Sequence, residues 1–242
     1  MNYNLKNLTI IQNFICTQPA RLEMIKSEVK KMSKIFKDCK FIVNYNSFKN
    51  LKEVKKIYEL NINKKHLCFS NDMRQNFAET TISLLEKVNT DYVLFICEDF
   101  IYLIEDQKYW EEIFHEISVN SLDFCMLAKI EKYNLEKYHK NYKKGNKIYL
   151  YHSSAAPTNR GVVSIDAIYK TNLLNKMLYK LKDIKEIKMH DGSISKYINM
   201  PNFYEQYFLA ENGMKSLDWK CAIPKEVVVY SCHPESQSER PW

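Results

Sequence analysis

Two adjacent carboxylates, Glu98 and Asp99, follow an apolar run in the stretch Thr90–Phe100, which reads TDYVLFICEDF. A short run rich in β-branched and aromatic residues is typical of a strand buried on both faces. Acids that directly follow such a strand lie at its carboxyl end, the edge where open α/β sheets bind ligands. Two acids there repel each other, so we expect a divalent cation carrying phosphate oxygens. On its own the dipeptide favours a solvated turn. Only the surrounding elements make a ligand site the better interpretation.

The composition of the 242-residue chain predicts a soluble globular protein, since 45% of residues are apolar and 27% are charged. No apolar run approaches the ~20 residues that cross a bilayer, and the first residues lack the pattern of a secretion signal. Seven cysteines without C-x-x-C pairs favour reduced, buried thiols. We therefore expect a cytoplasmic protein, and this expectation allows peripheral association with the inner face of the membrane.

The charge and the glycine content limit the ligands that the chain can bind. The net charge of +7 is spread over Lys-rich helices such as Lys26–Lys37, which is usually a solvated face. It is also compatible with a phosphate-bearing ligand or with peripheral association at an anionic membrane. The chain has only four glycines and contains neither G-x-G-x-x-G nor a P-loop. Nucleotide phosphates therefore need another partner, and a metal is one.

Alternating strands and helices precede the acidic pair. The expected strands are 8–16, 39–44, 65–69 and the apolar part of 90–97. Helices are expected from Pro19, with apolar residues at 22, 25, 29, 32 and 35, and at about 73–88, capped within Ser70–Asp72. Arg21 in a first helical turn opposes the helix dipole, which hints at a ligand, although a plain surface arginine is more common. This βαβ order predicts an α/β fold with a parallel sheet.

The pattern after the acids is coarser. We expect helices at 109–117, from Asp166 to about 181, at 193–200 and at 202–212. Strands are expected at 123–128, 149–152, 161–165 and 226–232, with a polar loop at 134–147. No repeat and no linker divides the chain, so one domain is predicted.

The segment Asn71–Asp99 resembles glycosyltransferases of the GT-A fold, and is similar to bacterial family 2 enzymes. In many members of that family, a helix beginning with Asn and Arg or Gly precedes a strand of the form DYVLFLDDD. The resemblance implies a Rossmann-like α/β/α sandwich with a mostly parallel central sheet. It also implies a nucleotide-binding half, residues 1–105, and an acceptor-binding half, residues 106–242. Glu98–Asp99 take the place of the DxD metal motif, but Cys97 stands where the first Asp is expected.

Three further features occur in the family's order. A small-residue loop precedes a strand at Arg160–Gly161–Val162, and Tyr204–Glu205–Gln206 matches the xED position with Gln in place of Asp. His233 follows the last expected strand, where family members complete the metal shell. The resemblance covers the whole chain, with its most specific part in residues 8–100.

The resemblance implies a role for each of these groups. Asp99 and His233 would hold Mn²⁺ or Mg²⁺, which neutralises charge on the departing diphosphate. Glu205 would be the base that takes the acceptor's proton, and such a base implies inversion. Asp166 and Asp191 are the alternative candidates for this base. Each has a plain alternative: a first-turn acid for Glu205, a helix cap for Asp166, a turn former for Asp191 and a solvated tail residue for His233.

Donor contacts are expected from loops that open at one edge of the sheet. The predicted nucleotide-sugar contacts are Thr17, Pro19, Arg21, Asn44, Asn71, Arg74, Glu98 and Gly161. The acceptor expected from the family is a surface glycan or a lipid-linked glycan of a bacterial polysaccharide pathway.

Three other functions remain open. A nucleotidyltransferase usually needs a Gly-rich phosphate loop near the first strand, and residues 17–21 contain none. A basic RNA-binding module would draw on the +7 charge, but no Arg-rich patch or RNP-type strand is present, so we expect no nucleic-acid partner. A non-catalytic GT-A-like carbohydrate- or nucleotide-binding protein is the third, because both acidic motifs depart from the family pattern.

Overall fold

The computed structural model describes residues 4–16, 18–73, 76–97, 100–127, 143–153, 166–184, 186–188, 194–195 and 218–231. A short 3₁₀ turn, η1 (Leu5–Asn7), leads into alternating strands and helices. These are β1 (Leu8–Phe14), α1 (Pro19–Ile35), β2 (Lys40–Tyr45), α2 (Leu51–Asn61), β3 (Leu67–Ser70), α3 (Phe77–Leu85) and β4 (Tyr92–Phe95). The βαβ order predicted from the sequence is therefore confirmed.

The rest of the described chain adds shorter strands and two helices. They are β5 (Phe100–Tyr102), α4 (Gln107–Val119), β6 (Phe124–Met126), β7 (Lys143–Lys144), β8 (Ile148–His152), β9 (Ala167–Lys170), α6 (Thr171–Leu181), β10 (Ile187–Lys188), β11 (Ile194–Ser195), β12 (Lys220–Pro224) and β13 (Val229–Ser231). Within the described ranges, no helix is both long enough and apolar enough to cross a membrane.

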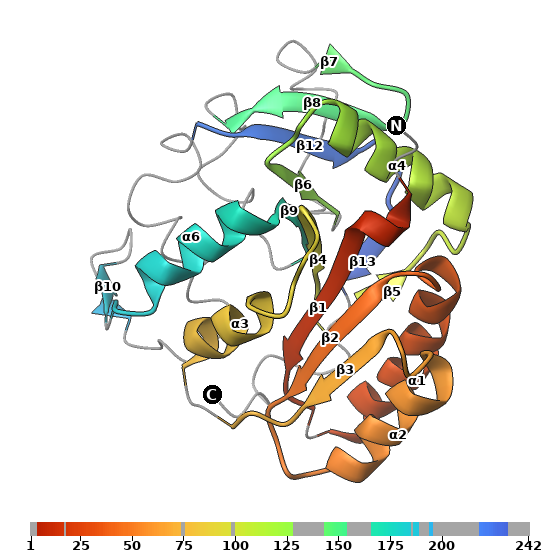
Figure 1. Cartoon of the computed structure of the whole chain (residues 1–242), viewed down its shortest axis with the longest axis vertical. Helices are drawn as coiled ribbons and strands as arrows, with labels where there is room; N and C mark the ends of the chain where they lie inside the picture. The colour runs from red at the N-terminus through yellow and green to blue at the C-terminus, as the bar shows by residue number, and fades with distance from the viewer. Residues whose placement is uncertain are drawn as a thin grey trace.

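One nine-stranded sheet organises these elements in the order β3-β2-β1-β4-β9-β6-β12-β8-β7 (Figure 1). β1 pairs in parallel with β2 and with β4, and β2 pairs in parallel with β3. β9 runs antiparallel to β4 and β6, and β8 runs antiparallel to β12 and β7, so the other strands share one direction. The sheet is mostly parallel, as predicted.

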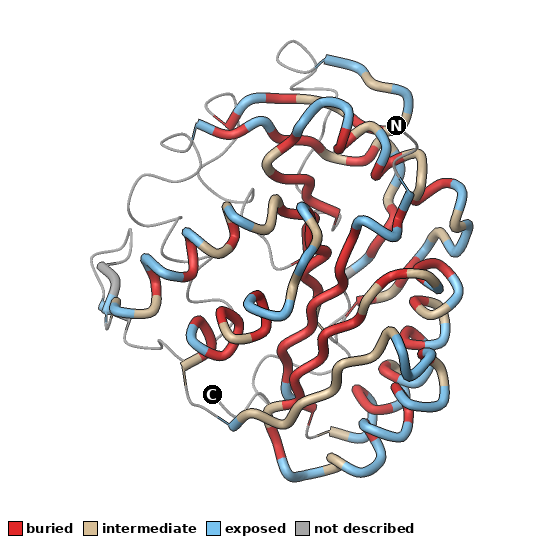
Figure 2. Tube along the Cα trace, in the orientation of Figure 1, coloured by how far each residue is buried: buried red, intermediate tan, exposed pale blue. Residues whose placement is uncertain are grey.

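Helices cover both faces of the sheet. α1, α2 and α4 pack on one face and α3 and α6 on the other, so two apolar clusters flank the central strands (Figure 1). β1, β2 and β4 lie between these layers and are almost wholly buried (Figure 2). This is the predicted α/β/α sandwich.

Local chemistry accounts for the first helices. α1 begins at Pro19, whose missing N–H costs nothing at a helix start, and its apolar residues at 22, 25, 29, 32 and 35 are buried. α2 was not predicted. It begins after Asn50, which adopts a left-handed conformation with φ of 60°, and it buries Val54, Ile57 and Tyr58 against the sheet.

Two expected helix starts are wrong, and one expected helix is contradicted. α3 begins at Phe77, not near 73, because the Asn76 side chain accepts from the N–H groups of Ala78 and Glu79 and caps the helix there. α6 begins at Thr171, not at Asp166, because the intervening residues pair as strand β9. The helix expected at 193–200 is contradicted at Ile194–Ser195, which form β11 and pair with β10.

Several strands were missed or misplaced. β5 and β12 were not predicted, and β13 is shorter than the expected strand 226–232. β7 occupies part of the predicted loop 134–147. The expected strand at 161–165 and helix at 202–212 lie outside the described residues.

The six described cysteines, Cys16, Cys39, Cys68, Cys97, Cys125 and Cys221, are thiols outside any disulfide, as predicted. Four of them are buried, and the other two are half-buried. Burial raises the pKa of the Cys39, Cys125 and Cys221 thiols, which therefore stay protonated and inert.

Candidate functional site

The strand order reverses between β1 and β4, at the centre of the sheet. The chain moves outward from β1 to β2 and β3, then returns to place β4 on the other side of β1. In open sheets of this kind, ligands bind in the crevice beyond the carboxyl ends of the strands at this switch point. The segments that follow β1, β2, β3 and β4 leave the sheet at this edge (Figure 1).

A buried network of amides ties these segments together. Asn44 Nδ2 donates to Asn13 Oδ1 and to the Asp72 carbonyl, both at 3.0 Å. Asn44 Oδ1 accepts from the Asp72 N–H at 2.7 Å and from Ser70 Oγ at 3.1 Å. Asn13 Nδ2 in turn donates to Thr81 Oγ1 on α3 at 3.0 Å. All donors and acceptors of the Asn44 amide are thus bonded within the protein, and its side chain is 0% exposed.

Asn71 connects the loop after β3 with the loop after β2. Its Nδ2 donates to the carbonyl oxygens of Tyr45 and of Ser47, the latter at 3.1 Å, and lies 3.6 Å from Met73 Sδ. The half-buried side chain therefore fixes the loop after β3 to the loop after β2, with its donors directed into the protein. Its Oδ1 makes none of these bonds, and is the part of the amide that can accept from a ligand.

Gln12 holds the chain just before the predicted acidic pair. Its Nε2 donates to the Cys97 carbonyl at 3.4 Å, and its Oε1 accepts from the Tyr58 hydroxyl at 2.8 Å. The Ile96 N–H also donates to the Ile11 carbonyl at 3.1 Å, which continues the β1–β4 pairing beyond β4. The position of Cys97 is therefore set from β1 and α2.

Two predicted donor contacts lie at the start of α1, directly after β1. Pro19 is exposed at the first helical position, and Arg21 is buried, with 9% of its surface exposed. No acidic residue occupies the first turn of α1. A buried guanidinium at the carboxyl edge of β1 is an unusual charge for a helix start and suits recognition of an anionic ligand.

Asp166 lies at the same edge, where β9 begins between β4 and β6. The next residue, Ala167, pairs with Phe95 and with Met126. The Asp166 carbonyl accepts from the Leu127 N–H at 2.9 Å. Only 6% of Asp166 is exposed. The alternative role as a helix cap is wrong, because Lys170 precedes the first residue of α6.

Tyr102, on β5, is a buried phenol near this edge. Burial raises its pKa well above the usual value, and the nearby Tyr58, Glu28 and Asp166 raise it further. Its hydroxyl has no hydrogen-bond partner among the described residues. Tyr102 is therefore a neutral phenol at any ordinary pH and is not a candidate base.

The remaining predicted site residues lie outside the described ranges. They are Thr17, Arg74, Glu98, Asp99, Gly161, Asp191, Glu205 and His233. Among the described residues, no three His, Cys, Asp or Glu side chains form a group suited to a metal. Gln12, Asn13 and Thr81 were not among the predicted site residues. Two of these are polar residues within an otherwise apolar strand, and that interruption was the available signal.

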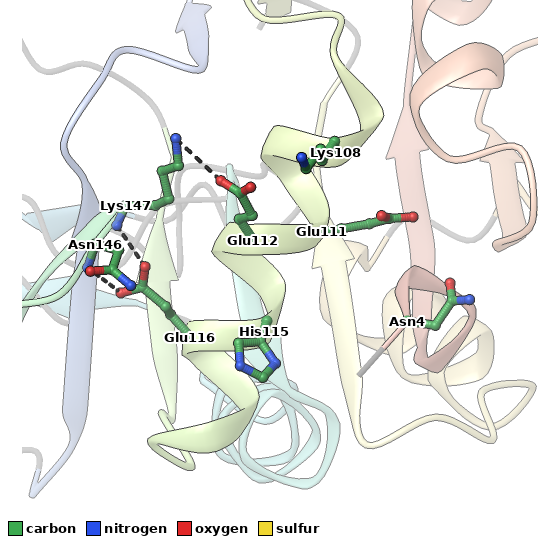
Figure 3. A pocket seen from close by; sticks show the side chains of 8 residues that line it. All are labelled: Asn4, Lys108, Glu111, Glu112, His115, Glu116, Asn146 and Lys147. Carbon is green, nitrogen blue, oxygen red and sulfur yellow. Dashed lines mark hydrogen bonds and ion pairs between the residues drawn. The ribbon is translucent and has the colours of Figure 1, made fainter. Parts of the chain in front are cut away.

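A cavity of about 420 Å³ lies at the opposite edge of the molecule, beside α4. It is lined by Asn4, Lys108, Glu111, Glu112, His115, Glu116, Asn146 and Lys147 (Figure 3). Glu116 accepts from the N–H groups of Asn146 at 3.0 Å and Lys147 at 2.6 Å, while Lys147 Nζ contacts Glu112 at 3.2 Å. Because Asn4 precedes β1, this cavity is at the amino end of the sheet. It contains none of the predicted site residues.

No protein-family model matches this sequence, and no curated protein matches it either. Solved structures resemble its fold. S. aureus TarS 1–349 in complex with UDP-GlcNAc has a TM-score of 0.54 and 13% identity, over 97% of this chain and 61% of that chain. Mannosyltransferase PcManGT from Pyrobaculum calidifontis, in complex with GDP-Man and Mn²⁺, has a TM-score of 0.56 and 11% identity, over 96% of this chain and 58% of that chain.

This likeness establishes the fold of the chain. It is the GT-A fold that the sequence predicts, with the α/β/α layers and the mostly parallel sheet described above. The chain spans about 60% of the length of these two structures.

Proposed function

We propose that this protein is a glycosyltransferase that moves a sugar from a nucleotide-sugar donor to a glycan acceptor. The observation that carries the proposal is the switch point between β1 and β4, where polar loops of a GT-A fold gather at the ligand-binding edge. Two solved structures of similar fold contain UDP-GlcNAc and GDP-Man. Residues 1–105 are the nucleotide-binding half in this proposal, and residues 106–242 bind the acceptor.

The donor contacts the loops after β1, β2 and β3. Arg21 supplies a cation to the diphosphate, and Asn71 offers its Oδ1 to the base or ribose. Asn44 takes an indirect part, because its bonded amide holds the loop that contains Asn71 and Asp72. The other proposed donor contacts are Thr17, Pro19, Arg74, Glu98 and Gly161.

A divalent cation, Mn²⁺ or Mg²⁺, is held by Asp99 and His233 in this proposal. Support comes from the strand register: Phe100 directly follows Asp99, and it pairs with Ser231, two residues before His233. Carboxylate and imidazole form a donor set that suits Mn²⁺. When bound, the metal would supply positive charge that neutralises negative charge on the departing diphosphate.

The acceptor hydroxyl loses a proton as it attacks the sugar, and Glu205 is the proposed base. Direct attack assisted by a carboxylate base inverts the configuration at the anomeric carbon. Asp166 and Asp191 are the reserve bases. Asp166 has support from its place beside the end of β4, although its carboxylate is buried.

The proposed acceptor is a bacterial surface polysaccharide or its lipid-linked precursor. The net charge of +7 suits peripheral association with an anionic membrane, where such acceptors are assembled. We accordingly propose a cytoplasmic location, at the inner face of the membrane.

Release of UDP from UDP-GlcNAc and of GDP from GDP-Man, with Mn²⁺ and a panel of glycan acceptors, tests the proposal. We expect Asp99→Asn to lower Mn²⁺-dependent turnover at least about a hundredfold, since a metal ligand is lost. Glu205→Gln should lower kcat by about 10²–10⁴ and leave donor affinity unchanged. Asp38→Asn, at the amino end of β2, is the control and should change neither. Full turnover by both site variants would contradict the proposal.

A further inference from the structure

β5 is a three-residue strand that directly follows the predicted acidic pair. It lies outside the main sheet and pairs only with β13, in a two-stranded sheet, within the described chain. An isolated two-stranded ribbon is marginally stable in water. The position of β5 therefore depends on what packs against its other side, and that element is α1 (Figure 1).

Two side chains of α1 bind both main-chain groups of Tyr102. The Leu103 N–H donates to the Val228 carbonyl at 3.0 Å, so the main-chain groups of the preceding residue point away from β13. On that side the Tyr102 N–H donates to Glu28 Oε2 at 2.8 Å, and the Tyr102 carbonyl accepts from Lys31 Nζ at 3.3 Å. The helix thus replaces a third strand.

Glu28 and Lys31 also bind each other, which orients both. Their charged groups are 3.0 Å apart on successive turns of α1, and Ser27 Oγ donates to Glu28 Oε1 at 3.2 Å. Only 7% of Glu28 is exposed, so its carboxylate depends on these three donors. Lys26–Lys37 was predicted to be a solvated face, and Lys31 departs from that expectation.

We propose that Glu28 and Lys31 are positioning residues for the metal site, an inference that rests on the proposed function. Tyr102 is three residues from Asp99, and β5 pairs with the strand that leads to His233. Three residues span at most about 10 Å, so a fixed Tyr102 restrains where Asp99 lies. The clamp, defined as Glu28, Lys31 and the Tyr102 main chain, therefore fixes β5, which Asp99 precedes in the sequence, and through β5 the paired strand β13, which His233 follows.

Metal affinity separates this role from a purely structural one. A structural clamp changes the melting temperature but leaves the Mn²⁺ affinity of the folded protein unchanged. A positioning clamp changes that affinity, because misplaced ligands bind a metal less tightly. Residues that orient metal ligands typically alter affinity by about 10–100-fold when substituted.

The experiment is a Mn²⁺ titration, followed by electron paramagnetic resonance of the free ion, on protein saturated with UDP and, in a second series, with GDP. All variants are measured at a temperature where circular dichroism shows them folded. Glu28→Gln keeps an oxygen for the Tyr102 N–H but removes the charge, and should raise the Kd for Mn²⁺ about tenfold. Glu28→Ala removes both and should raise it further.

The control is Glu116→Gln at the opposite edge of the sheet. Like Glu28, Glu116 accepts from the main chain, in its case from the N–H groups of Asn146 and Lys147, so the substitution makes the same chemical change (Figure 3). This variant should stay within twofold of the wild-type Kd. Lys31→Met should weaken Mn²⁺ binding and Lys31→Arg should restore it, which provides a second test if Glu28 variants do not fold.

Two results would overturn the inference, and they are distinguishable. If wild-type protein binds Mn²⁺ but Glu28→Gln and Lys31→Met bind it equally well, the clamp has only a structural role and the proposed function stands. If wild-type protein binds no Mn²⁺ with either nucleotide, the metal site fails and the inference fails with it.

Discussion

Asn44 and Glu28 are both buried polar side chains that hold main-chain groups of another segment, but one is neutral and the other is charged. Asn44 satisfies all its donors and acceptors within the sheet edge, and needs no counter-ion. Glu28 needs Lys31, and together they hold a strand that the main sheet does not include. The amide network therefore fixes the proposed nucleotide side by packing, whereas the clamp fixes the proposed metal side by an ion pair.

The largest expected effect comes from breaking the amide network. Asn44→Ala removes four hydrogen bonds and leaves Oδ1 of the buried Asn13 without the Asn44 donor, and a buried group of this kind costs about 1–3 kcal/mol. We expect the free energy of unfolding to fall by about 3 kcal/mol, measured by urea denaturation. Asn71→Ala, at a half-buried position, should cost only about 1 kcal/mol. Equal losses would show that burial does not set the difference.

Breaking the clamp should have a smaller effect on stability. Glu28→Ala should lower the free energy of unfolding by about 2 kcal/mol, less than for a fully buried pair, because Lys31 can reach water. Glu28→Gln should cost about 1 kcal/mol, since one hydrogen bond survives. Urea denaturation of both variants beside Glu116→Gln checks this order. A loss for Glu28→Ala as large as that for Asn44→Ala would remove the contrast between the two regions.

The smallest expected effect concerns Tyr102. Its buried hydroxyl has no partner in the described part of the chain, so Tyr102→Phe should stabilise the protein by about 1 kcal/mol at neutral pH. The folded-state pKa of Tyr102 lies above its unfolded value, so the phenol ionises first in the unfolded state. Its ionisation therefore leaves stability unchanged below about pH 10 and lowers the free energy of unfolding as pH rises beyond that.

Tyr102→Phe should therefore flatten the alkaline decline by up to about 1.4 kcal/mol per pH unit, as measured by urea denaturation between pH 9 and 11. Asn44→Ala provides the comparison, because the amide network contains no group that titrates there. An unchanged slope for Tyr102→Phe would show that the phenol is not the titrating group.

The βαβ half was predictable because its signals are local. Apolar runs mark β1, β2 and β4, and Pro19 marks the start of α1. The start of α3 was misplaced because Ser70–Asp72 and Asn76 are all suitable caps, and only packing selects Asn76. Residues of β9 were predicted to begin a helix. A strand of only four residues is too short to show a clear periodicity, and its pairing with β4 and β6 is not visible in the sequence.

The two polar devices were not predictable, because their partners are distant in the sequence. Asn44 was correctly placed at a strand end, but its bonds to Asp72 and Asn13 depend on how the three strands align. In the sequence, Lys31 does not differ from the other lysines of α1. Only the packing of β5 against the helix gives it a specific partner, the Tyr102 carbonyl. Charge and spacing alone do not distinguish a clamp from a solvated face.

The most direct test of the proposed function is a thermal-shift titration of the wild-type protein with UDP, GDP, CMP and dTDP, each with and without Mn²⁺. A nucleotide at about a hundredfold excess over its Kd adds about 2.7 kcal/mol, which corresponds to roughly 5–10 °C for a domain of this size. We predict such a shift for one nucleotide, larger with Mn²⁺ and reduced in Asp99→Asn. No shift with any nucleotide, in a sample that melts cooperatively, would contradict the account.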